Sequence, residues 1–274
     1  MTADVELIEP AADLKRNAAR RGSGRSAKLR IVGTQLAILI AFFAVWEAAV
    51  RFGKLNPFFF GMPTEILQNL IEWILDGSIF LNALATLNEA VSGFLLAVVL
   101  AVPIGIFLAR SPFWGKVFHP FIDLANSTPR FALAPLFVLI FGLGMMTKVV
   151  LVFSVVFFVM LINTIAGASA IEKNYIRFAQ LVGVSKRQLF LKVIVPATAG
   201  WLIAGMRIGA PYAIAAAVVG EMISANQGLG YLVVKYAGLL EMSKVLAAVL
   251  VLAVGGWGLN ACISSLVKRL PWVR

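Results

Sequence analysis

Charged and amide side chains stand inside long apolar stretches of this sequence. They are Glu47, Glu89, Asp123, Asn126, Arg130, Asn163, Arg207 and Glu221. A charge at the centre of a bilayer costs at least about 2.5–3.5 kcal/mol, so such groups usually face a bundle interior or a wet cavity. The chemistry that they suit is recognition and passage of a polar solute. A single histidine, His119, and the lack of HExxH and GxxxxGK[ST] motifs predict neither a catalytic residue nor a metal site.

Arg207 has two open interpretations. It stands in GMRIG, a GxxxG motif that continues into Ala213 and Ala217 and predicts a small-residue seam for close helix contact. A step of two residues turns a helix by about 200°, so we expect Arg207 to point away from that seam. There it either faces a solute pathway as a cation or pairs with a carboxylate such as Glu89 or Asp123.

Arg130 and Glu221 are ambiguous in similar ways. Arg130 follows Pro129 inside an apolar stretch and has the same two interpretations as Arg207, with snorkelling toward the cytoplasm as a third. Glu221 lies at the outer end of its stretch and is either a gate residue or an interfacial one. Helix-breaking proline also recurs, at positions 103, 129, 135 and 211, and breaks at membrane depth are tolerated where protein or water satisfies the freed backbone groups.

The composition indicates whether water or lipid surrounds this chain. Hydrophobic residues make up 61% of the 274 positions and charged residues 14%, with a mean hydropathy of +0.92. These values indicate an integral membrane protein, and the long apolar runs predict an all-α, polytopic fold. The third run contains NSTPR, so we expect one broken span there. The six expected spans cover about 33–50, 84–109, 120–144, 148–170, 197–220 and 245–267.

Charge placement gives the expected topology. Seventeen of the 24 Lys and Arg residues fall on the side of the N-terminal tail and five on the other. By the positive-inside rule, both termini and the segment 171–196 are cytoplasmic. The net charge of +11 follows from this asymmetry and does not indicate nucleic-acid binding. We expect residues 1–32 to form a flexible cytoplasmic tail and 33–274 a transmembrane domain, in which Cys262 is a packing residue.

The cytoplasmic segment about 171–196 has helical signals of its own. One face carries Tyr175, Phe178, Ala179 and Val182. Gly183 can end this first helix, and Ser185 with Gln188 has the form of a capping box that begins a second one. Pro196 marks the start of the next span. Such a helix–glycine–helix either rests on lipid or docks to another protein.

A resemblance favours docking. The spacing Ala179-x3-Gly183-x9-Val193-x-Val195-Pro196 resembles the cytoplasmic EAA loop of permease subunits of binding-protein-dependent ABC importers. It departs where the family has Glu-Ala, because this chain has Arg177-Phe178. Further stretches are similar to the branch that transports nitrate, taurine and aliphatic sulfonates, over roughly residues 40–272. They are TLNEAVSGFLLAVVLAVPIG, TPRFALAPLFVLIFGLGMMTK, GMRIGAPYAIAAAVVGEMISANQGLGYL and the terminal LPW.

The resemblance implies a type I ABC importer permease fold and a small, anionic solute of the sulfonate, taurine or nitrate type, delivered by a solute-binding protein. The alternative is a heterocyclic or aromatic nutrient, such as riboflavin, a thiamine-pyrimidine precursor or an aromatic carboxylate, because Glu89 in TLNEAVSGF is similar to the form of those members. Two other classes stay open: a secondary transporter, which should show inverted repeats, and an assembly protein without transport.

The resemblance also implies partners. They are a second copy of this chain, two cytoplasmic ATPase subunits that use ATP and Mg²⁺, and an extracytoplasmic binding protein, in a bacterial-type inner (plasma) membrane. The chain itself would be a non-catalytic subunit and would bind no cofactor. The implied coupling residues are Arg177, Phe178, Ala179, Val182, Gly183, Ser185, Leu189 and Pro196, of which Phe178, Val182, Gly183 and Leu189 would contact the ATPase. The pathway candidates are Glu89, Arg130, Asn163, Arg207 and Glu221.

Overall fold

The computed structural model describes residues 9–172, 177–179, 181–224 and 226–267, with side chains from residue 30 onward except those of residues 186, 266 and 267. The chain divides into two compact units, Met1–Thr64 and Glu65–Arg274. In the first unit, helix α1 (Glu9–Arg51) is followed by the single turn α2 (Pro57–Phe60). Helix α1 therefore runs through much of the segment expected to be a flexible tail, a stretch rich in the helix formers Ala, Arg, Lys and Leu.

The end of α1 is fixed by a carboxylate. Glu47 accepts a hydrogen bond from the Arg51 guanidinium at 2.7 Å and two from Thr64, one from its hydroxyl at 2.9 Å and one from its backbone N–H at 3.1 Å. The apolar part of α1, Arg30–Arg51, is long enough to cross a membrane. Glu47 is thus a structural residue at the end of a span.

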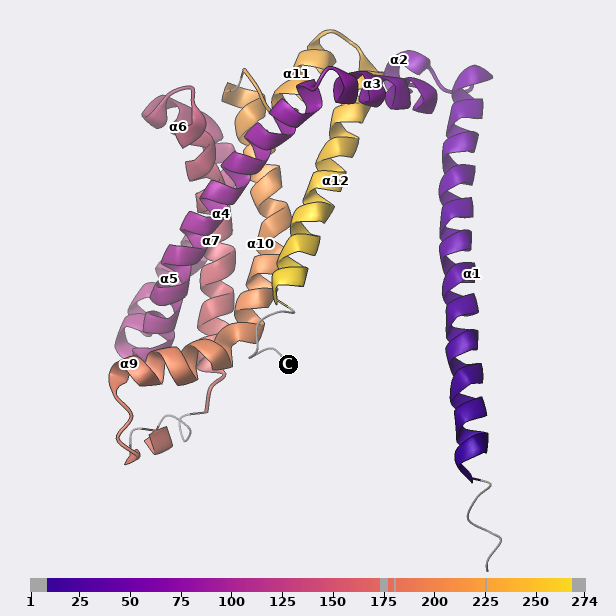
Figure 1. Cartoon of the computed structure of the whole chain (residues 1–274). Coiled ribbons are helices and arrows are strands. Elements are labelled where there is room, and N and C mark those ends of the chain that lie inside the picture. Colours follow the sequence, from indigo (N-terminus) through magenta and orange to yellow (C-terminus); the bar gives the residue numbers. More distant parts are fainter. Residues whose placement is uncertain (1–8, 173–176, 180, 225, 268–274) are drawn as a thin grey trace, which may run out of the picture. The chain divides into compact units, whose positions relative to one another are not determined.

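The second unit is a helix bundle (Figure 1). Its α-helices are α3 (Pro63–Leu75), α4 (Ser78–Arg110), α5 (Pro112–Ser127), α6 (Ala134–Phe141), α7 (Met145–Ser169), α9 (Lys186–Leu189), α10 (Val195–Ser224), α11 (Leu229–Gly238) and α12 (Met242–Val267). A 3₁₀ turn η1 (Arg130–Leu133) precedes α6, and a π-helical turn η2 (Phe190–Ile194) precedes α10. Just before α4, the side chain and the backbone N–H of Ser78 donate hydrogen bonds to the Asp76 carboxylate. These hydrogen bonds lower the pKa of Asp76 below its ordinary value.

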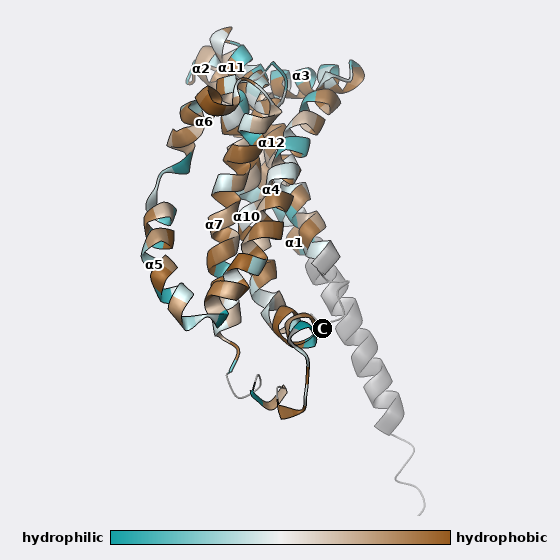
Figure 2. Ribbon diagram, turned by 90° about the vertical axis from the view of Figure 1, so that its left-hand side faces the viewer, coloured by the Kyte–Doolittle hydropathy of each residue, from teal (hydrophilic) through white to brown (hydrophobic). Residues whose placement is uncertain are grey.

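Figures 1 and 2 show how the bundle is threaded. Helices α4, α7 and α12 run from the end where α11 lies, the α11 end, to the end where α9 lies, the α9 end. Helix α10 runs the opposite way, and the α5–η1–α6 segment returns from the α9 end to the α11 end. That segment is bent by 79° at the break between Ser127 and Arg130. In the described residues five helices are long and apolar enough to cross a membrane, and the number rises to the expected six if the bent α5–η1–α6 segment is one broken span.

The four prolines act differently. Pro129 lies at the break in the third span, where the chain has lost helical hydrogen bonds, and Pro135 stands in the first turn of α6, which tolerates proline. Pro103 and Pro211 lie inside α4 and α10, which continue through them. The expectation of helix breaks is therefore met at the third span only.

Helix α7 is the central element of the bundle, and it packs between α4 and α10. Small residues make this possible: Gly93 of α4 faces Val152, while Gly209 of α10 faces Val156. The seam predicted on α10 is confirmed, since Ala213 and Ala217 are fully buried along it. Brown and white segments make up most of α7 and α10 in Figure 2, as expected for helices of an apolar bundle.

Candidate functional site

The segment after residue 176 forms the turn that the sequence predicted. Gly183 has φ +82°, and the Val184 N–H donates to the Ala179 carbonyl at 3.1 Å, which is the hydrogen bond of a Schellman motif. The Gln188 N–H donates to Ser185 Oγ at 3.3 Å, and the Ser185 N–H donates to Gln188 Oε1 at 3.2 Å. This reciprocal pair is a capping box, so both local predictions are confirmed.

The turn presents apolar side chains to the outside. Phe178 is 69% exposed, Leu181 86% and Val182 66%, and Arg177 beside them is exposed as well. These four residues form what we call the exposed turn patch. Exposed apolar patches mark surfaces that contact another protein or a membrane. The predicted residue Tyr175 lies outside the described residues.

The second half of the segment is an anchor. Leu189 is 8% exposed and Ile194 6%, and they pack with Ile106 at the end of α4 and Ala168 at the end of α7. Leu189 therefore faces the bundle, which does not fit the contact with an ATPase expected for it. Its burial instead ties the exposed turn patch to two central helices. Pro196, half-buried, stands in the first turn of α10 as expected.

A cavity of about 410 Å³ lies at the break in the third span. It is lined by Asn126, Arg130, Phe131, Val155, Val159, Ile162, Asn163, Ile208 and Tyr212. We call it the Arg130 cavity. The guanidinium of Arg130 donates to the Ala125 carbonyl at 2.7 Å and lies 4.4 Å from the centre of the Phe158 ring. These contacts orient a half-buried cation beside the cavity.

Asn163, on α7, lines the same Arg130 cavity. Its amide nitrogen donates to the Val159 carbonyl at 2.8 Å, which leaves the amide oxygen for other donors. The structure thus brings together two of the predicted pathway residues, Arg130 and Asn163. They come from segments 33 residues apart, and their shared cavity could not be read from spacing.

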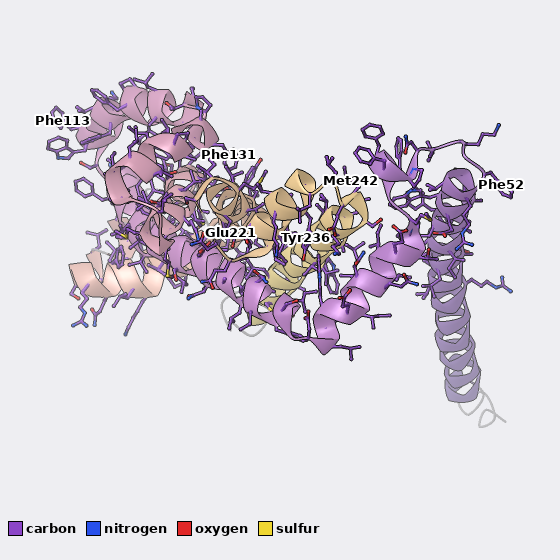
Figure 3. The ribbon with its side chains drawn as sticks, turned by 90° about the horizontal axis from the view of Figure 1, so that it is seen from above. Phe52, Phe113, Phe131, Glu221, Tyr236 and Met242 are labelled. Atoms are coloured by element: carbon purple, nitrogen blue, oxygen red, sulfur yellow. The ribbon has the colours of Figure 1, made fainter. Side chains whose placement is uncertain are left out.

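A second group of polar residues is buried near the α11 end. Lys148 of α7 and Glu89 of α4 form an ion pair at 2.7 Å, and both are 4% exposed. Glu221 of α10 is 1% exposed and accepts hydrogen bonds from the Thr86 hydroxyl and the Gly230 N–H, each at 2.7 Å. Figure 3 shows Glu221 among the helices when the second unit is viewed from the α11 end. Glu221 is therefore neither interfacial nor exposed to a channel in this structure.

The sequence did not indicate the partners in this group. Lys148 stands at the start of an apolar run, which predicts a place on the outer flank of a span, and Thr86 and Asn82 resemble ordinary helix-interior residues. One sequence feature could have indicated the ion pair. Lys148 lies in one apolar run, and two carboxylates without an assigned partner lie in other apolar runs. A cavity of about 530 Å³, which we call the α11-end cavity, adjoins the ion pair, and its lining includes Asn88, Lys148, Ser224, Asn226 and Gln227.

Arg207 lies apart from both groups. It is exposed, on the side of α10 opposite the seam of Gly205 and Gly209, as its spacing predicted. Within the described part of the chain, Glu89 pairs with Lys148, and Asp123 pairs with His119 at 2.9 Å. The interpretation of Arg207 as the partner of either carboxylate is therefore wrong.

An apolar bundle with a capped, exposed turn at one end and polar cavities between its helices suits a membrane transport subunit. Residues 101–271 match the family described as the binding-protein-dependent transport system inner membrane component. The chain belongs to this family. It is a permease subunit of an ABC importer in an inner membrane, and it works with an ATPase and a solute-binding protein.

Named relatives of this permease cover almost its whole length. The taurine transport system permease protein of Escherichia coli strain K12 is 28% identical over 259 residues, which are 92% of this chain and 94% of that protein. The formylaminopyrimidine transport permease protein of Halalkalibacterium halodurans is 32% identical over 234 residues, or 83% and 91% of the two chains.

A solved structure agrees with the fold. The MetNI methionine ABC transporter, in inward-facing conformations, contains a chain that superposes on this permease with a TM-score of 0.55 and 17% sequence identity. The match covers 72% of this chain and 97% of that one. At this identity the comparison supports the arrangement of helices, which is that of a type I importer permease as predicted.

Proposed function

We propose that this permease forms a homodimer that carries a small organic or inorganic anion of the sulfonate, taurine or nitrate type into the cell, after a solute-binding protein has delivered it. The observation that carries the solute class is the Arg130 cavity. A cationic guanidinium and the amides of Asn126 and Asn163 surround it, and such groups bind the oxygens of an oxyanion. The relationship to a taurine permease supports the same class.

A heterocyclic nutrient is the second candidate. Phe131 and Tyr212 line the same cavity and offer ring faces on which a flat solute can stack. The relative from Halalkalibacterium halodurans is named for transport of a formylaminopyrimidine. The two candidates differ in charge, so they differ in what Arg130 contributes.

Uptake of competing solutes separates these candidates. The complex is reconstituted in liposomes. Radiolabelled taurine or formylaminopyrimidine is then added together with a solute-binding protein that binds it. We expect uptake of taurine and at least a tenfold loss in Arg130→Gln, because the neutral amide retains hydrogen bonds but not the charge. Asn69→Ala, which removes an amide on α3 away from the cavity, is the control. Uptake of the pyrimidine, unchanged by Arg130→Gln, would support the second candidate instead.

In our proposal, the ATPase subunits act on this chain through the exposed turn patch. ATP and Mg²⁺ belong to two ATPase subunits, and closure of their dimer would push on residues 177–189. Leu189 and Ile194 pass that movement to the ends of α4 and α7, because their side chains are buried against both helices. Rigid-body rocking of the helices would then alternate access to the pathway. The pathway candidates Glu89 and Glu221 contribute through the buried group near the α11 end.

The position of Arg207 leaves it a candidate for the pathway at the dimer interface. It is an exposed cation on a helix that lies next to the Arg130 cavity through Ile208 and Tyr212. A charge exposed at membrane depth is costly unless protein or water covers it, and the second copy of the chain would supply that cover.

The patch can be tested by association. Phe178→Asp places a charge in the exposed turn patch, so the amount of ATPase that copurifies with the permease should fall at least tenfold. The matched control is Leu239→Asp, which charges an exposed leucine directly after α11. If both variants retain the ATPase equally, the patch is not the docking surface.

A further inference from the structure

Glu221 uses both oxygens of its carboxylate inside the protein. Oε1 accepts the Thr86 hydroxyl and Oε2 accepts the Gly230 N–H. With 1% of the residue exposed, the carboxylate offers almost no surface to a passing solute. Its partners therefore indicate what it does.

Those partners hold the start of α11. Three successive backbone N–H groups are bound by side chains from other helices: Gly228 by Asn82 Oδ1 at 2.8 Å, Leu229 by Thr86 Oγ1 at 2.9 Å, and Gly230 by Glu221. The first N–H groups of a helix have no partners within it and carry a partial positive charge, so a carboxylate and a hydroxyl stabilise them. We call these six residues the α11 lock.

The two glycines of the α11 lock allow the backbone to close around the carboxylate. Gly228 has φ +113°, which L residues with side chains rarely adopt, and a side chain there would collide with the Glu221 carboxylate. A Cβ at Gly230 would lie 2.5 Å from the Val218 carbonyl oxygen. The sequence Gly-Leu-Gly is thus explained by the close approach of this loop to α10.

The α11 lock also determines one wall of the α11-end cavity. Asn226 and Gln227 line that cavity and immediately precede Gly228 in the chain. Lys148, which pairs with Glu89, lines it as well. The hydrogen bonds to residues 228–230 therefore fix the point from which the wall residues extend.

We propose that Glu221 is a positioning residue of the transport pathway. It acts through residues 226–230 and the N-terminus of α11, and its carboxylate does not contact the solute. This inference rests on the proposed function in one respect: it takes the α11-end cavity to be part of the transport pathway. The Gly-Leu-Gly loop is then a wall element whose geometry is determined by α4 and α10 together.

Hydrogen exchange tests the positioning directly. The permease is studied with its ATPase subunits in lipid nanodiscs, and exchange is followed in a peptide that spans residues 226–232. In Glu221→Ala these amides should exchange about fivefold faster or more. The variant loses a hydrogen bond whose net contribution to local stability is about 1 kcal/mol. Glu221→Gln should stay within about twofold of the natural protein, because its carbonyl can accept from Gly230 and its NH₂ can donate to Thr86. A peptide from the middle of α7 serves as the internal control.

The functional arm compares the same variants in taurine uptake. Positioning predicts that uptake falls in Glu221→Ala and is retained in Glu221→Gln. If Glu221→Gln loses uptake as fully as Glu221→Ala while its exchange is normal, the charge itself is required and the inference is wrong. Unchanged exchange in Glu221→Ala would also overturn it.

A second pair of variants covers a failure to fold. Thr86→Val removes the hydroxyl that joins Glu221 to Leu229, and Thr86→Ser keeps it, so exchange should rise in the first and not in the second. Equal exchange in the two would contradict the proposal. If the natural complex does not accumulate taurine, the proposed solute is wrong, and the exchange results still decide the role of Glu221.

Discussion

The two buried carboxylates of this permease are stabilised by different groups. Glu89 has a cationic partner, Lys148, on a neighbouring helix, whereas Glu221 has a hydroxyl and a backbone N–H. Each is nearly inaccessible to solvent, so each depends on its partner to offset the loss of hydration. The two residues should therefore respond differently to neutral substitution.

Removal of Lys148 should be far more harmful than removal of the whole ion pair. Lys148→Met leaves the Glu89 carboxylate buried without its cation, which costs about 3–5 kcal/mol of stability for a buried pair. The double variant Lys148→Met with Glu89→Gln removes the charge of both partners of this ion pair and should recover most of that loss. Thermal unfolding of the purified permease in one detergent measures both. A double variant as unstable as the single one would show that the pair contributes more than charge balance.

Sequence reasoning identified the carboxylates but not their partners. Glu89 and Glu221 are conspicuous because they interrupt apolar runs, and a local pattern suffices to find them. Their partners lie 59 and 135 residues away, for Lys148 and Thr86 respectively, and depend on how three helices pack. A period or a motif within one helix carries no information on such pairs. The capping box at Ser185 was predicted because both of its residues lie within one turn.

At the scale of the helices, the bundle depends on small residues on both sides of α7. On α4 the residues that face it are Ala90, Gly93, Ala97, Ala101 and Gly105, and on α10 they are Gly205, Gly209, Ala213 and Ala217. Packing in lipid lacks a hydrophobic driving force between helices, so close backbone approach supplies much of the contact energy. The α10 seam contains a GxxxG motif and was predicted. In the α4 seam, alanines separate the two glycines, so it contains no GxxxG motif, and it was not predicted.

A pair of glycine substitutions tests this packing. In Gly93→Ala the new Cβ would lie 2.5 Å from Val152 Cβ, so α4 and α7 must separate, at a cost of about 1–3 kcal/mol. Gly200 lies in α10 with no atom within 4 Å of such a Cβ. Gly200→Ala should be neutral or stabilising by up to about 1 kcal/mol, because alanine favours helix. Thermal unfolding under identical conditions compares the two, and an equal loss in both would contradict the seam.

At the scale of the whole chain, hydropathy predicted the spans well and the third one incompletely. The apolar runs around α4, α7, α10 and α12 were each located within several residues, because about 20 apolar residues leave few alternatives to a membrane helix. The break near Pro129 was anticipated from NSTPR, but its 79° bend depends on tertiary contacts of η1, including the contact of Arg130 with Phe158. Whether that segment crosses the membrane determines the orientation of everything after it.

Labelling from each side of the membrane tests the crossing. Because α4 and α7 run in the same direction, α5–η1–α6 must cross, and residues 116 and 143 should lie on opposite sides. Lys116 and Leu143 are both exposed. Each is changed to Cys in a Cys262→Ser background, where it is the single thiol, and treated with an impermeant maleimide in sealed vesicles of either orientation.

The two thiols are expected to react from opposite sides of the membrane. A thiol at residue 116 should react from the cytoplasmic side, together with a reference thiol at residue 187 in the basic segment near the α9 end, because positive residues favour that side. A thiol at residue 143 should react from the opposite side, together with one at residue 227. Labelling of 116 and 143 from one side would make the segment a re-entrant loop. It would then reverse α7 relative to α4, which is incompatible with the packing of Gly93 against Val152 and with the ion pair between Lys148 and Glu89.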